Sequence, residues 1–455
     1  MSLKLYNTAP RKLETFKPSG DVVKVYTCGP TVYGYQHIGN YAAYVYWDLL
    51  VRVLRANDYT VRRVLNLTDV GHLVSDGDEG EDKLEKGARR EGVDVWEVAQ
   101  KFIDDFLTNY RRLKLSEPEV IARATDYITE DMEAVDLMRE RGYTYEIEDG
   151  VYYDTSKFPG YADFARLDVS GLKAGARVEF SDKKRNATDF AVWKFIKPGE
   201  KHAMRWDYLG RPGYPGWHLE CSTIIHKELG EPIDIHTGGV DHIPIHHTNE
   251  IAECYAAYGH ALARIWMHCN FITVEGEKIS KSLGNVYLLS DLEEKGFSPM
   301  DYKMWLLSGH YQGTRNFTFD SLEGAQNRRK AWRERIASCY QAGQGSAVTG
   351  SVTWVDFKAK LLDAVNNNLN SAEAFKVIDE NELQIADWEY VDEMFGLGLM
   401  EETPDVPAEV YELIRERDAV RAEKNYARSD EIRDELGRRG IGVRDTADGG
   451  KWYYL

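Results

Sequence analysis

The chain has 455 residues, a formal net charge of −18 and a pI of about 5.2. This length predicts two to four domains. Hydrophobic residues make up 43% and charged residues 29% of the chain, which permits large cores and excludes global disorder. The acidic charge excludes indiscriminate coating of polyanions, although local basic patches can still bind a nucleic acid.

The sequence contains no apolar run close to the roughly 20 residues that a membrane span needs. Residues 1–16 also lack the apolar stretch of a secretory signal, so we expect a cytoplasmic protein without a membrane partner. The five cysteines, at positions 28, 221, 254, 269 and 339, are odd in number and irregularly spaced. This spacing fits no disulfide framework and favours reduced cysteines, some of them on a metal.

The first part of the chain has a strand–helix–strand pattern. Residues 22–26 (VVKVY) are predicted as a strand, and a glycine-rich stretch follows. Residues 41–58 repeat apolar side chains at spacings of three and four, which predicts a helix, and residues 61–67 form a second strand candidate. This order so early in the chain predicts a parallel α/β sheet.

The next part resembles an insertion between two halves of a sheet. Residues 82–141 are mostly helical in pattern, and residues 143–155 predict a hairpin with its turn at Asp149–Gly150. The sequence is then irregular and rich in lysine, glycine and aspartate to about residue 210. We therefore expect the insertion to cover residues 116–210.

A second α/β stretch begins near residue 215. Residues 217–230 and 243–260 are predicted as helices, and residues 233–239 and 265–276 as strands. After residue 290 the pattern becomes helical, with a surface loop expected at 341–351 and a domain joint at 404–410. About 45 residues at the end of the chain form a charged helix pattern that ends in RDTADGGKWYYL.

Several residues of metal-ligating type stand out. His246 and Glu250 lie four residues apart in a predicted helix, so both side chains face one side. Two thiolates, one imidazole and one carboxylate make a reasonable zinc site. That set is Cys28, Cys221, His246 and Glu250. Cys254 shares the helical face and His247 is adjacent, so spacing alone leaves the ligands open, and a lone cysteine is more often a small buried hydrophobe.

Two short motifs suit a nucleotide. HIGN at 37–40 begins a helix after a strand and a glycine-rich turn, and helix N-termini attract phosphates. His37 can donate to a phosphate oxygen, and Gly39 permits close approach by a purine or ribose. KISKS at 278–282 places Lys278 and Lys281 in a loop, where two lysines suit triphosphate oxygens and transition-state charge. Taken singly, the motifs equally fit a helix cap and a solvated basic turn.

The turn HTGGVD, at 236–241, ends a predicted strand. In doubly wound folds this position faces the ligand crevice, so Asp241 is a candidate for ribose hydroxyls. A helix N-cap is the structural alternative for the same residue.

Seven strings, taken together, resemble cysteinyl-tRNA synthetases, a class I aminoacyl-tRNA synthetase family. They are YTCGPTVY, HIGN, NLTD, PGWHLECS, DIHTGGVDHIPIHHTNEIA, KISKSLGN and ARSDEIRDELGRRGIGVRDT, in the order of the family. The resemblance covers nearly the whole chain, and PGWHLECS with HHTNE is more specific than either nucleotide motif. It implies ATP-dependent activation of L-cysteine to an adenylate and transfer to tRNA(Cys), with Mg²⁺ accompanying ATP.

The resemblance also implies a domain order. A Rossmann-like, doubly wound parallel sheet forms the catalytic domain, with an insertion, and a helical bundle and a small anticodon-binding domain follow. The expected ranges are 1–115 and 211–290 for the two catalytic halves, 116–210 for the insertion, 291–325 for a stem-contact region, 326–403 for the bundle and 404–455 for the anticodon-binding domain. We expect a monomer.

Site residues carried over from the family fall on positions of this chain. One zinc ion per chain is implied on Cys28, Cys221, His246 and Glu250. Cysteine binding is implied for Cys28, Thr68, Trp217 and His236, and ATP binding for His37, Gly39, Asn40, Gly238, Gly239, Asp241 and Lys281. His37, Lys278 and Lys281 are the expected catalytic stabilisers, and Arg421, Asp430, Asp445 and Trp452 the anticodon candidates, with Trp452 either stacking or packing.

Three positions depart from the family pattern. Asn40 replaces a histidine, for which we expect a changed contact to ATP without loss of activity. Ile279 replaces a methionine, and NLTDVGHL lacks two acidic residues after Thr-Asp, so the loop SDGDEGED is expected to be arranged differently. Selection of cysteine by zinc–thiolate chemistry is expected to exceed the ~1–3 kcal/mol that shape gives for one small group.

Three rivals remain for the activity: a ligase that joins cysteine to an amino-sugar, a non-catalytic zinc and RNA-binding paralogue, and a synthetase for another amino acid such as methionine. The ARSDEIRDELGRRG match argues against the first, because that ligase lacks the C-terminal module. His37 and both loop lysines argue against the second. Cys28 with PGWHLECS argues against the third.

Overall fold

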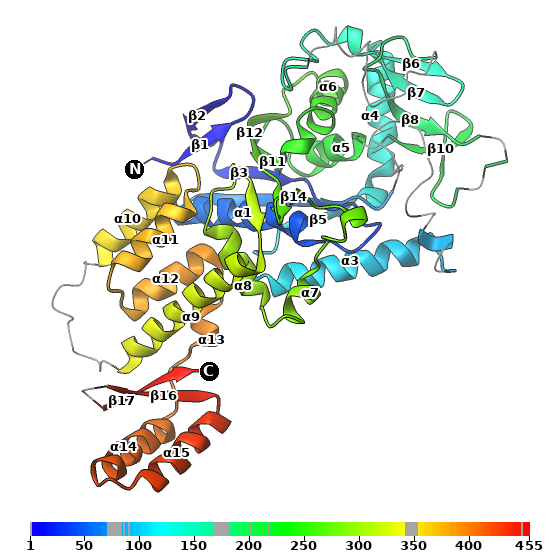
Figure 1. Cartoon of the computed structure of the whole chain (residues 1–455). Helices are drawn as coiled ribbons and strands as arrows, with labels where there is room; N and C mark the ends of the chain where they lie inside the picture. Colours follow the sequence, from blue (N-terminus) through cyan, green and yellow to red (C-terminus); the bar gives the residue numbers. More distant parts are fainter. Residues whose placement is uncertain are drawn as a thin grey trace.

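The structure is a computed structural model, and it describes residues 2–70, 84, 87–89, 92–167, 183–197, 199–200, 202–216, 218–341, 354–446 and 449–455. Figure 1 shows the N-terminal half at the top, a helical bundle below it and a small C-terminal unit at the far end. No helix in these ranges is long and apolar enough to cross a membrane.

The N-terminal half is built on a five-stranded parallel sheet, in the order β12-β11-β3-β4-β5. Its strands are β3 (Val22–Thr27), β4 (Thr60–Leu67), β5 (Val120–Arg123), β11 (Ile233–Gly239) and β12 (Ala263–Cys269). The chain runs outward from β3 through β4 to β5, then returns to the other side of β3 with β11 and β12. The order therefore reverses between β3 and β11, where doubly wound sheets bind ligands. The predicted α/β sheet is confirmed.

Alternate strand residues supply two cores, one on each face of this sheet. Val25 and Leu65 belong to the core that includes the buried side of α1 (Ile38–Ala56). Tyr26 and Val64 face the opposite way, into the core with α5 (Leu219–Glu228). Helices α3 (Val95–Arg112), α4 (Ile128–Glu140) and α6 (His246–Tyr258) complete this half, and a hairpin of β1 (Lys4–Asn7) and β2 (Lys12–Thr15) begins it.

The insertion is a second sheet, antiparallel in the order β6-β7-β8-β10-β9. Its strands are β6 (Thr144–Ile147), β7 (Gly150–Tyr153), β8 (Phe190–Phe195), β9 (Trp206–Tyr208) and β10 (Arg211–Pro215). The hairpin prediction is confirmed, but Ile147 pairs with Gly150, so Glu148 and Asp149 form the turn instead of Asp149–Gly150.

Two further features of this region differ from the sequence expectation. The stretch expected to be irregular to about residue 210 contains β8, in which all six residues are buried. β5 lies within the expected insertion range 116–210, yet it pairs with β4 in the parallel sheet. Both differences arise because distant strand partners, which local composition does not reveal, bury these segments.

The KISKS segment begins at the edge of a three-stranded sheet of β13 (Ile272–Val274), β14 (Glu277–Lys278) and β15 (Arg315–Phe317), with Lys278 ending β14 and Lys281 beginning a 3-10 turn. Helices follow as expected: α7 (Leu289–Glu293), α8 (Pro299–Leu307), α9 (Phe319–Gln341), α10 (Trp354–Asn366), α11 (Ser371–Glu380), α12 (Ile385–Phe395) and α13 (Leu399–Glu402). The surface loop expected at 341–351 lies outside the described residues except for Gln341, which ends α9.

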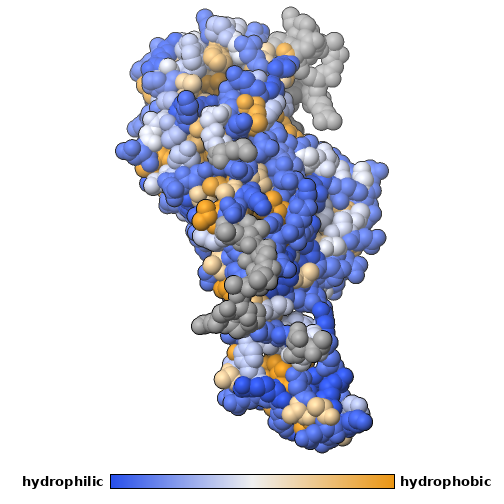
Figure 2. All heavy atoms as spheres, turned by 90° about the vertical axis from the view of Figure 1, so that its left-hand side faces the viewer, coloured by the Kyte–Doolittle hydropathy of each residue, from blue (hydrophilic) through white to orange (hydrophobic). Residues whose placement is uncertain are grey.

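The C-terminal unit has its own core. It consists of α14 (Ala408–Ala422), α15 (Tyr426–Arg438) and a hairpin of β16 (Ile441–Thr446) with β17 (Gly449–Tyr454). The charged helix pattern thus ends at residue 438, and the last residues form strands, because Ile441, Val443 and Trp452 bury their side chains against both helices. Figure 2 shows this unit as a narrow lobe with a mainly hydrophilic surface.

Candidate active site and metal centre

Cys28 directly follows β3, at the point where the strand order of the parallel sheet reverses. Its position is fixed by the next residue, Gly29, whose N–H donates to Asn66 Oδ1 at 2.7 Å. A Cβ at Gly29 would lie 1.5 Å from the carbonyl oxygen of Asn66, so only glycine permits this close approach. The loop carrying Cys28 is therefore held against the end of β4.

Cys28, Cys221, His246 and Glu250 converge, and their ligand atoms lie within 4.8 Å of one another. Cys221 lies on α5, while His246 and Glu250 lie one turn apart at the start of α6. Cys254 lies outside this group, and its sulfur contacts the carbonyl oxygen of His260 at 3.6 Å. The sequence spacing did not decide between Cys221 and Cys254 as the candidate metal ligand, and the structure places Cys221 in the cluster.

A second group of ligand atoms overlaps the first. It contains Cys28, His236, His247 and Glu250, again within 4.8 Å of one another. The structure thus gathers both adjacent histidines of α6, and His236 from β11, around Cys28 and Glu250. Between His246 and His247 the positions alone do not choose.

The donor atoms of this cluster fit a zinc ion. Glu250 is fully buried, and its carboxylate oxygens lie 2.8 Å from His236 Nε2 and 2.9 Å from His246 Nε2. Beyond these two imidazole contacts, neither oxygen accepts a hydrogen bond among the described residues. Buried charged groups are normally paired or bound to a metal, and sulfur, imidazole and carboxylate ligands are those that zinc prefers.

The pKa values of the two cysteine thiols are shifted in opposite directions. Burial alone would raise the pKa of Cys28, but a hydrogen bond from Cys221 and the nearby His247 hold that pKa well below its ordinary value. Burial and Cys28 raise the pKa of Cys221 well above its ordinary value. Despite burial, His236 and His246 keep the pKa of Glu250 low. These directions favour the deprotonated forms of Cys28 and Glu250, which are the forms that bind a metal ion.

Several residues that support the cluster were missed by sequence reasoning. His218 Nδ1 lies 2.9 Å from His246 Nδ1, and His268 Nε2 lies 2.7 Å from His247 Nδ1. His242 lies beside His246 and His247, with ring centroids 5.2 and 5.1 Å away. Signals existed for His218, which stands in PGWHLECS beside Cys221, and for His242, which stands in DIHTGGVDHIPIHHTNEIA. His268 carried none, because its contacts depend on how β12 and α6 pack.

The residues expected to bind cysteine lie around this cluster as far as they are described. Thr68 is buried and donates to Glu220 Oε1 at 2.6 Å, while Asn66 Nδ2 donates to Thr68 Oγ1 at 3.1 Å. Burial raises the pKa of Glu220 well above its ordinary value. His236 stacks on Trp266 with ring centroids 4.5 Å apart. Trp217 lies outside the described residues.

The two nucleotide motifs meet at the N-terminus of α1. His37 is the N-cap residue, and Gly39 lies so close to the KISKS loop that a Cβ would be 2.8 Å from Ile279 Cδ1. The N–H of Ile38 donates to the Tyr287 carbonyl at 2.9 Å. Burial lowers the pKa of His37, and the nearby Lys281 lowers it further, so the ring is neutral near pH 7.

Asn40 has a local role in this helix start. Its Oδ1 accepts the backbone N–H of His37 at 3.0 Å, which completes a capping box. The side chain that replaces the family histidine thus satisfies one of the helix-end donors. The change of contact to ATP that we expected for Asn40 stays a prediction.

The KISKS loop is held by Asn285. Its Oδ1 accepts the N–H of Ser280 at 2.8 Å, and its Nδ2 donates to the Lys278 carbonyl at 3.1 Å. Lys278 and Lys281 are exposed. The loop backbone is therefore fixed while both lysine side chains are exposed, and Lys281 lies near enough to His37 to affect its pKa.

The two glycines at the end of β11 have different neighbours. Gly238 is buried beneath histidines, and a Cβ there would lie 2.7 Å from His242 Nδ1 and from His247 Cε1. Gly239 accommodates the carboxylate of Asp241, which would lie 2.3 Å from a Cβ. Asp241 itself is exposed.

The four candidates in the C-terminal unit have different environments. Trp452 is 2% exposed and lies in the core, so packing is its role here and stacking on a base is not. Asp445 is paired with Arg417 at 2.7 Å and with Arg421 at 3.0 Å. Asp430 is exposed on α15, with a side chain that is 69% accessible.

Two family models match the chain. The class I (C) tRNA synthetase catalytic domain matches residues 15–327, and the cysteinyl-tRNA ligase anticodon-binding domain matches residues 403–453. Among curated relatives, cysteine–tRNA ligase 1 of Burkholderia lata is 42% identical, with 99% of this chain and 96% of the relative covered. Cysteine–tRNA ligase of Treponema denticola is 38% identical over the whole of both chains.

Solved structures show the same fold at lower identity. Mycobacterium tuberculosis methionyl-tRNA synthetase in complex with methionyl-adenylate superposes with a TM-score of 0.56 at 16% identity, covering 84% of this chain and 89% of that one. A putative arginyl-tRNA synthetase from Campylobacter jejuni gives a TM-score of 0.51 at 14% identity, covering 85% and 92%.

Proposed function

The chain belongs to the cysteine–tRNA ligase family of class I aminoacyl-tRNA synthetases, and from this premise we propose that it activates L-cysteine with ATP and transfers it to the 3′ end of tRNA(Cys). The observation that carries the proposal is the convergence of a buried ligand set at the strand-order reversal. We propose that the set Cys28, Cys221, His246 and Glu250 holds one zinc ion.

In the activation step the cysteine carboxylate attacks the α-phosphorus of ATP and pyrophosphate leaves. The chain contributes positioning and charge stabilisation. We assign His37 to donate one N–H to a phosphate oxygen, since its ring is neutral. Lys278 and Lys281 stabilise the charge that develops on the triphosphate, which Mg²⁺ accompanies. Gly39, Asn40, Gly238, Gly239 and Asp241 complete the proposed ATP-binding residues.

Selection of cysteine follows from the ligand set. Zinc, when bound, supplies an acceptor for the substrate thiolate, which a serine hydroxyl replaces poorly at neutral pH. Thr68 and His236 lie beside the cluster and are assigned, with Trp217, to orient the amino acid. Glu250 already holds two imidazoles at 2.8 and 2.9 Å, so its carboxylate is the ligand that we assign to yield or rearrange.

The proposed partner surface for tRNA is the C-terminal unit with the bundle. Arg421, Asp430 and Asp445 remain the candidates for base edges, because all three side chains are accessible. The domain ranges predicted from the sequence, a monomeric state and a cytoplasmic location belong to the same proposal.

The deciding experiment measures ATP–pyrophosphate exchange with cysteine, serine and methionine side by side, with zinc content determined on the same sample. We expect exchange with cysteine alone and about one zinc per chain. Absence of exchange in zinc-replete protein would reject the activation step. Exchange with cysteine in a fully metal-free sample would reject the role given to zinc.

A further inference from the structure

A line of three contacts runs from the N-terminal hairpin to the sulfur of Cys28. Thr8 Oγ1, in the turn after β1, lies 2.8 Å from His268 Nδ1 on β12. His268 Nε2 lies 2.7 Å from His247 Nδ1 on α6. His247 Nε2 in turn lies 3.4 Å from Cys28 Sγ. All four residues are buried.

The protons of this line have one arrangement when Cys28 is a metal ligand. A thiolate has no proton to give, so His247 Nε2 must carry the N–H of the last contact. A neutral ring has one N–H, so His247 Nδ1 accepts, and His268 donates through Nε2. His268 Nδ1 then accepts, and the Thr8 hydroxyl is its donor. Every donor in the line therefore points towards the sulfur.

We infer that Thr8 and His268 are positioning residues for the metal centre, which hold His247 in the tautomer that donates an N–H to the Cys28 thiolate. The inference rests on the proposed function, because it takes Cys28 as a zinc ligand. An N–H···S bond draws charge from the thiolate and orients it, as partners of metal ligands commonly do. The cluster is thereby kept receptive to a further thiolate from the substrate.

This arrangement also separates the two overlapping ligand sets. In the set with His236, the only nitrogen that His247 offers to a metal is Nε2, because His268 occupies Nδ1. A protonated Nε2 cannot bind a metal ion. The metal ion is therefore bound by the other set, Cys28, Cys221, His246 and Glu250.

Two variants of His268 test the inference on the full-length chain. In His268→Gln the amide can still donate to His247 Nδ1, whereas in His268→Met a side chain of similar length cannot. Zinc affinity is measured by competition with a chelator, and the sulfur-to-metal charge-transfer band is recorded on the cobalt-loaded protein.

We expect His268→Met to weaken zinc binding about 10–100-fold and to shift the band, while His268→Gln stays close to the unmodified chain. Unchanged affinity and band in His268→Met would overturn the inference. Equal losses in both variants would overturn it too, since a role in packing alone predicts that result.

A second pair keeps the test open if His268→Met does not fold. Thr8→Val removes only the hydroxyl, and Thr8→Ser retains it, so zinc affinity should fall in the first and persist in the second. The proposed function fails if the unmodified chain binds no zinc or does not exchange with cysteine. The inference alone fails if the unmodified chain does both and Thr8→Val matches it.

Discussion

At the residue scale, Cys221 and Cys254 on neighbouring helices show that the position of a thiol, more than its burial, decides whether it can be a metal ligand. Cys221 and Cys254 are both buried, and burial is the main cause that raises the pKa of each thiol. Only Cys221 has its sulfur among the ligand atoms around Glu250. A thiol becomes a ligand here because of its neighbours, which is why a direct comparison of the two residues is informative.

We predict that Cys221→Ser loses zinc and cysteine affinity, whereas Cys254→Ser keeps both. Removing one of four zinc ligands leaves an incomplete set, and loss of metal should raise the KM for cysteine at least 10-fold. The measurement is zinc content by elemental analysis together with cysteine-dependent exchange. Full zinc content in Cys221→Ser, or equal losses in both variants, would contradict the assignment.

The candidate site was predictable where it depends on local spacing. His246 and Glu250 share a helix face at four residues apart, and the structure brings them together as that spacing predicts. Thr8 and His268 were not predictable, because they lie 260 residues apart in the chain and meet only when β1 and β12 pack. Asn40 shows a third case, in which a residue expected at the nucleotide also caps its own helix.

At the element scale, the contact between α1 and the KISKS loop carries a prediction. A Cβ on Gly39 would lie 2.8 Å from both Ile279 Cδ1 and His37 Cε1, so Gly39→Ala must displace the loop or the ring. We expect the KM for ATP in the exchange reaction to rise about 10-fold, which corresponds to roughly 1.4 kcal/mol of binding. Gly34→Ala is the control, since nothing lies within 4 Å of a Cβ there. The same KM in both variants would refute this role.

The packing of α4 on α5 predicts a dependence of stability on pH. Burial raises the pKa of Asp131 to about 7. The hydroxyl of Thr223 donates to this carboxylate at 2.6 Å, which lowers the pKa but only partly offsets the effect of burial. The unfolded chain releases the proton at its ordinary pKa of about 4. The protonated carboxyl therefore stabilises the fold below about pH 4, and this contribution is lost as the pH rises to about 7.

The corresponding variant is Asp131→Asn, which mimics the protonated carboxyl at every pH. We compare the change in the free energy of unfolding that this substitution causes at the two pH values. We expect that change to be more favourable at pH 8 than at pH 4 by on the order of 2–4 kcal/mol. Urea unfolding at both pH values measures the difference. An effect that does not change between pH 4 and pH 8 would show that Asp131 titrates normally.

Elements with a strong period of their own were predictable, and those that depend on remote partners were not. Helix α1 repeats apolar residues every three or four positions, and the predicted range 41–58 lies largely within Ile38–Ala56. β8 is buried between β7 and β10, so its strand character comes from the sheet. Strand β17 begins with two glycines and pairs with β16, although the charged helix pattern suggested no strand there.

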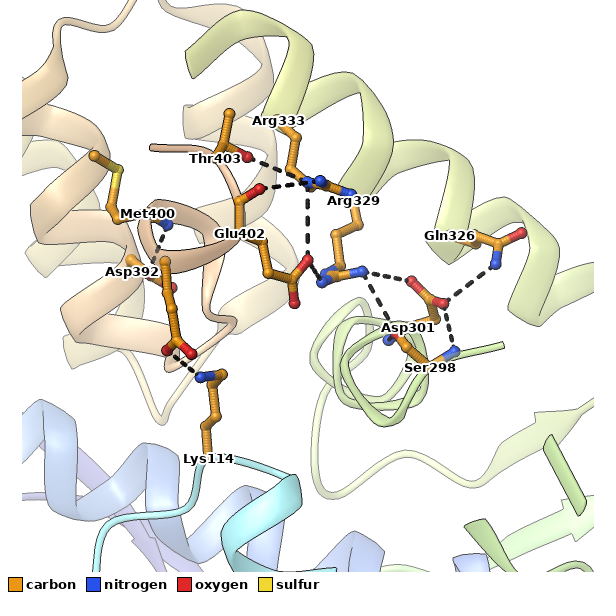
Figure 3. Close-up of polar contacts among 11 residues, drawn as sticks. Lys114, Ser298, Asp301, Gln326, Arg329, Arg333, Asp392, Met400, Glu402 and Thr403 are labelled. Atoms are coloured by element: carbon orange, nitrogen blue, oxygen red, sulfur yellow. Dashed lines mark hydrogen bonds and ion pairs between the residues drawn. The ribbon is translucent and has the colours of Figure 1, made fainter. Parts of the chain in front are cut away.

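At the scale of the whole molecule, helix α9 links the N-terminal half to the C-terminal unit. Figure 3 shows Arg329 of α9 between Asp301 of α8 and Glu402 of α13, with Arg333 beside them. Arg333 donates to Thr403 Oγ1 at 3.1 Å, directly before the domain joint. At its far end α9 meets β17 through two hydrogen bonds of 2.9 Å between Gln341 and Trp452. Helices α7 and α8 follow the KISKS loop in the chain, so α9 packs both on the segment after this loop and on the C-terminal unit.

We therefore predict that Glu402→Gln separates the two reactions of the enzyme. The substitution leaves the buried Arg329 with Asp301 as its remaining carboxylate and weakens the joint, while the adenylation residues are untouched. Charging of tRNA(Cys) should fall about 10-fold in kcat/KM, or roughly 1.4 kcal/mol, with pyrophosphate exchange unchanged. Glu373→Gln is the matched control, since it breaks only the exposed pair with Lys376 at 3.7 Å. If exchange and charging fell together, Glu402 would support the fold in general; if neither fell, the joint would not position the C-terminal unit for tRNA.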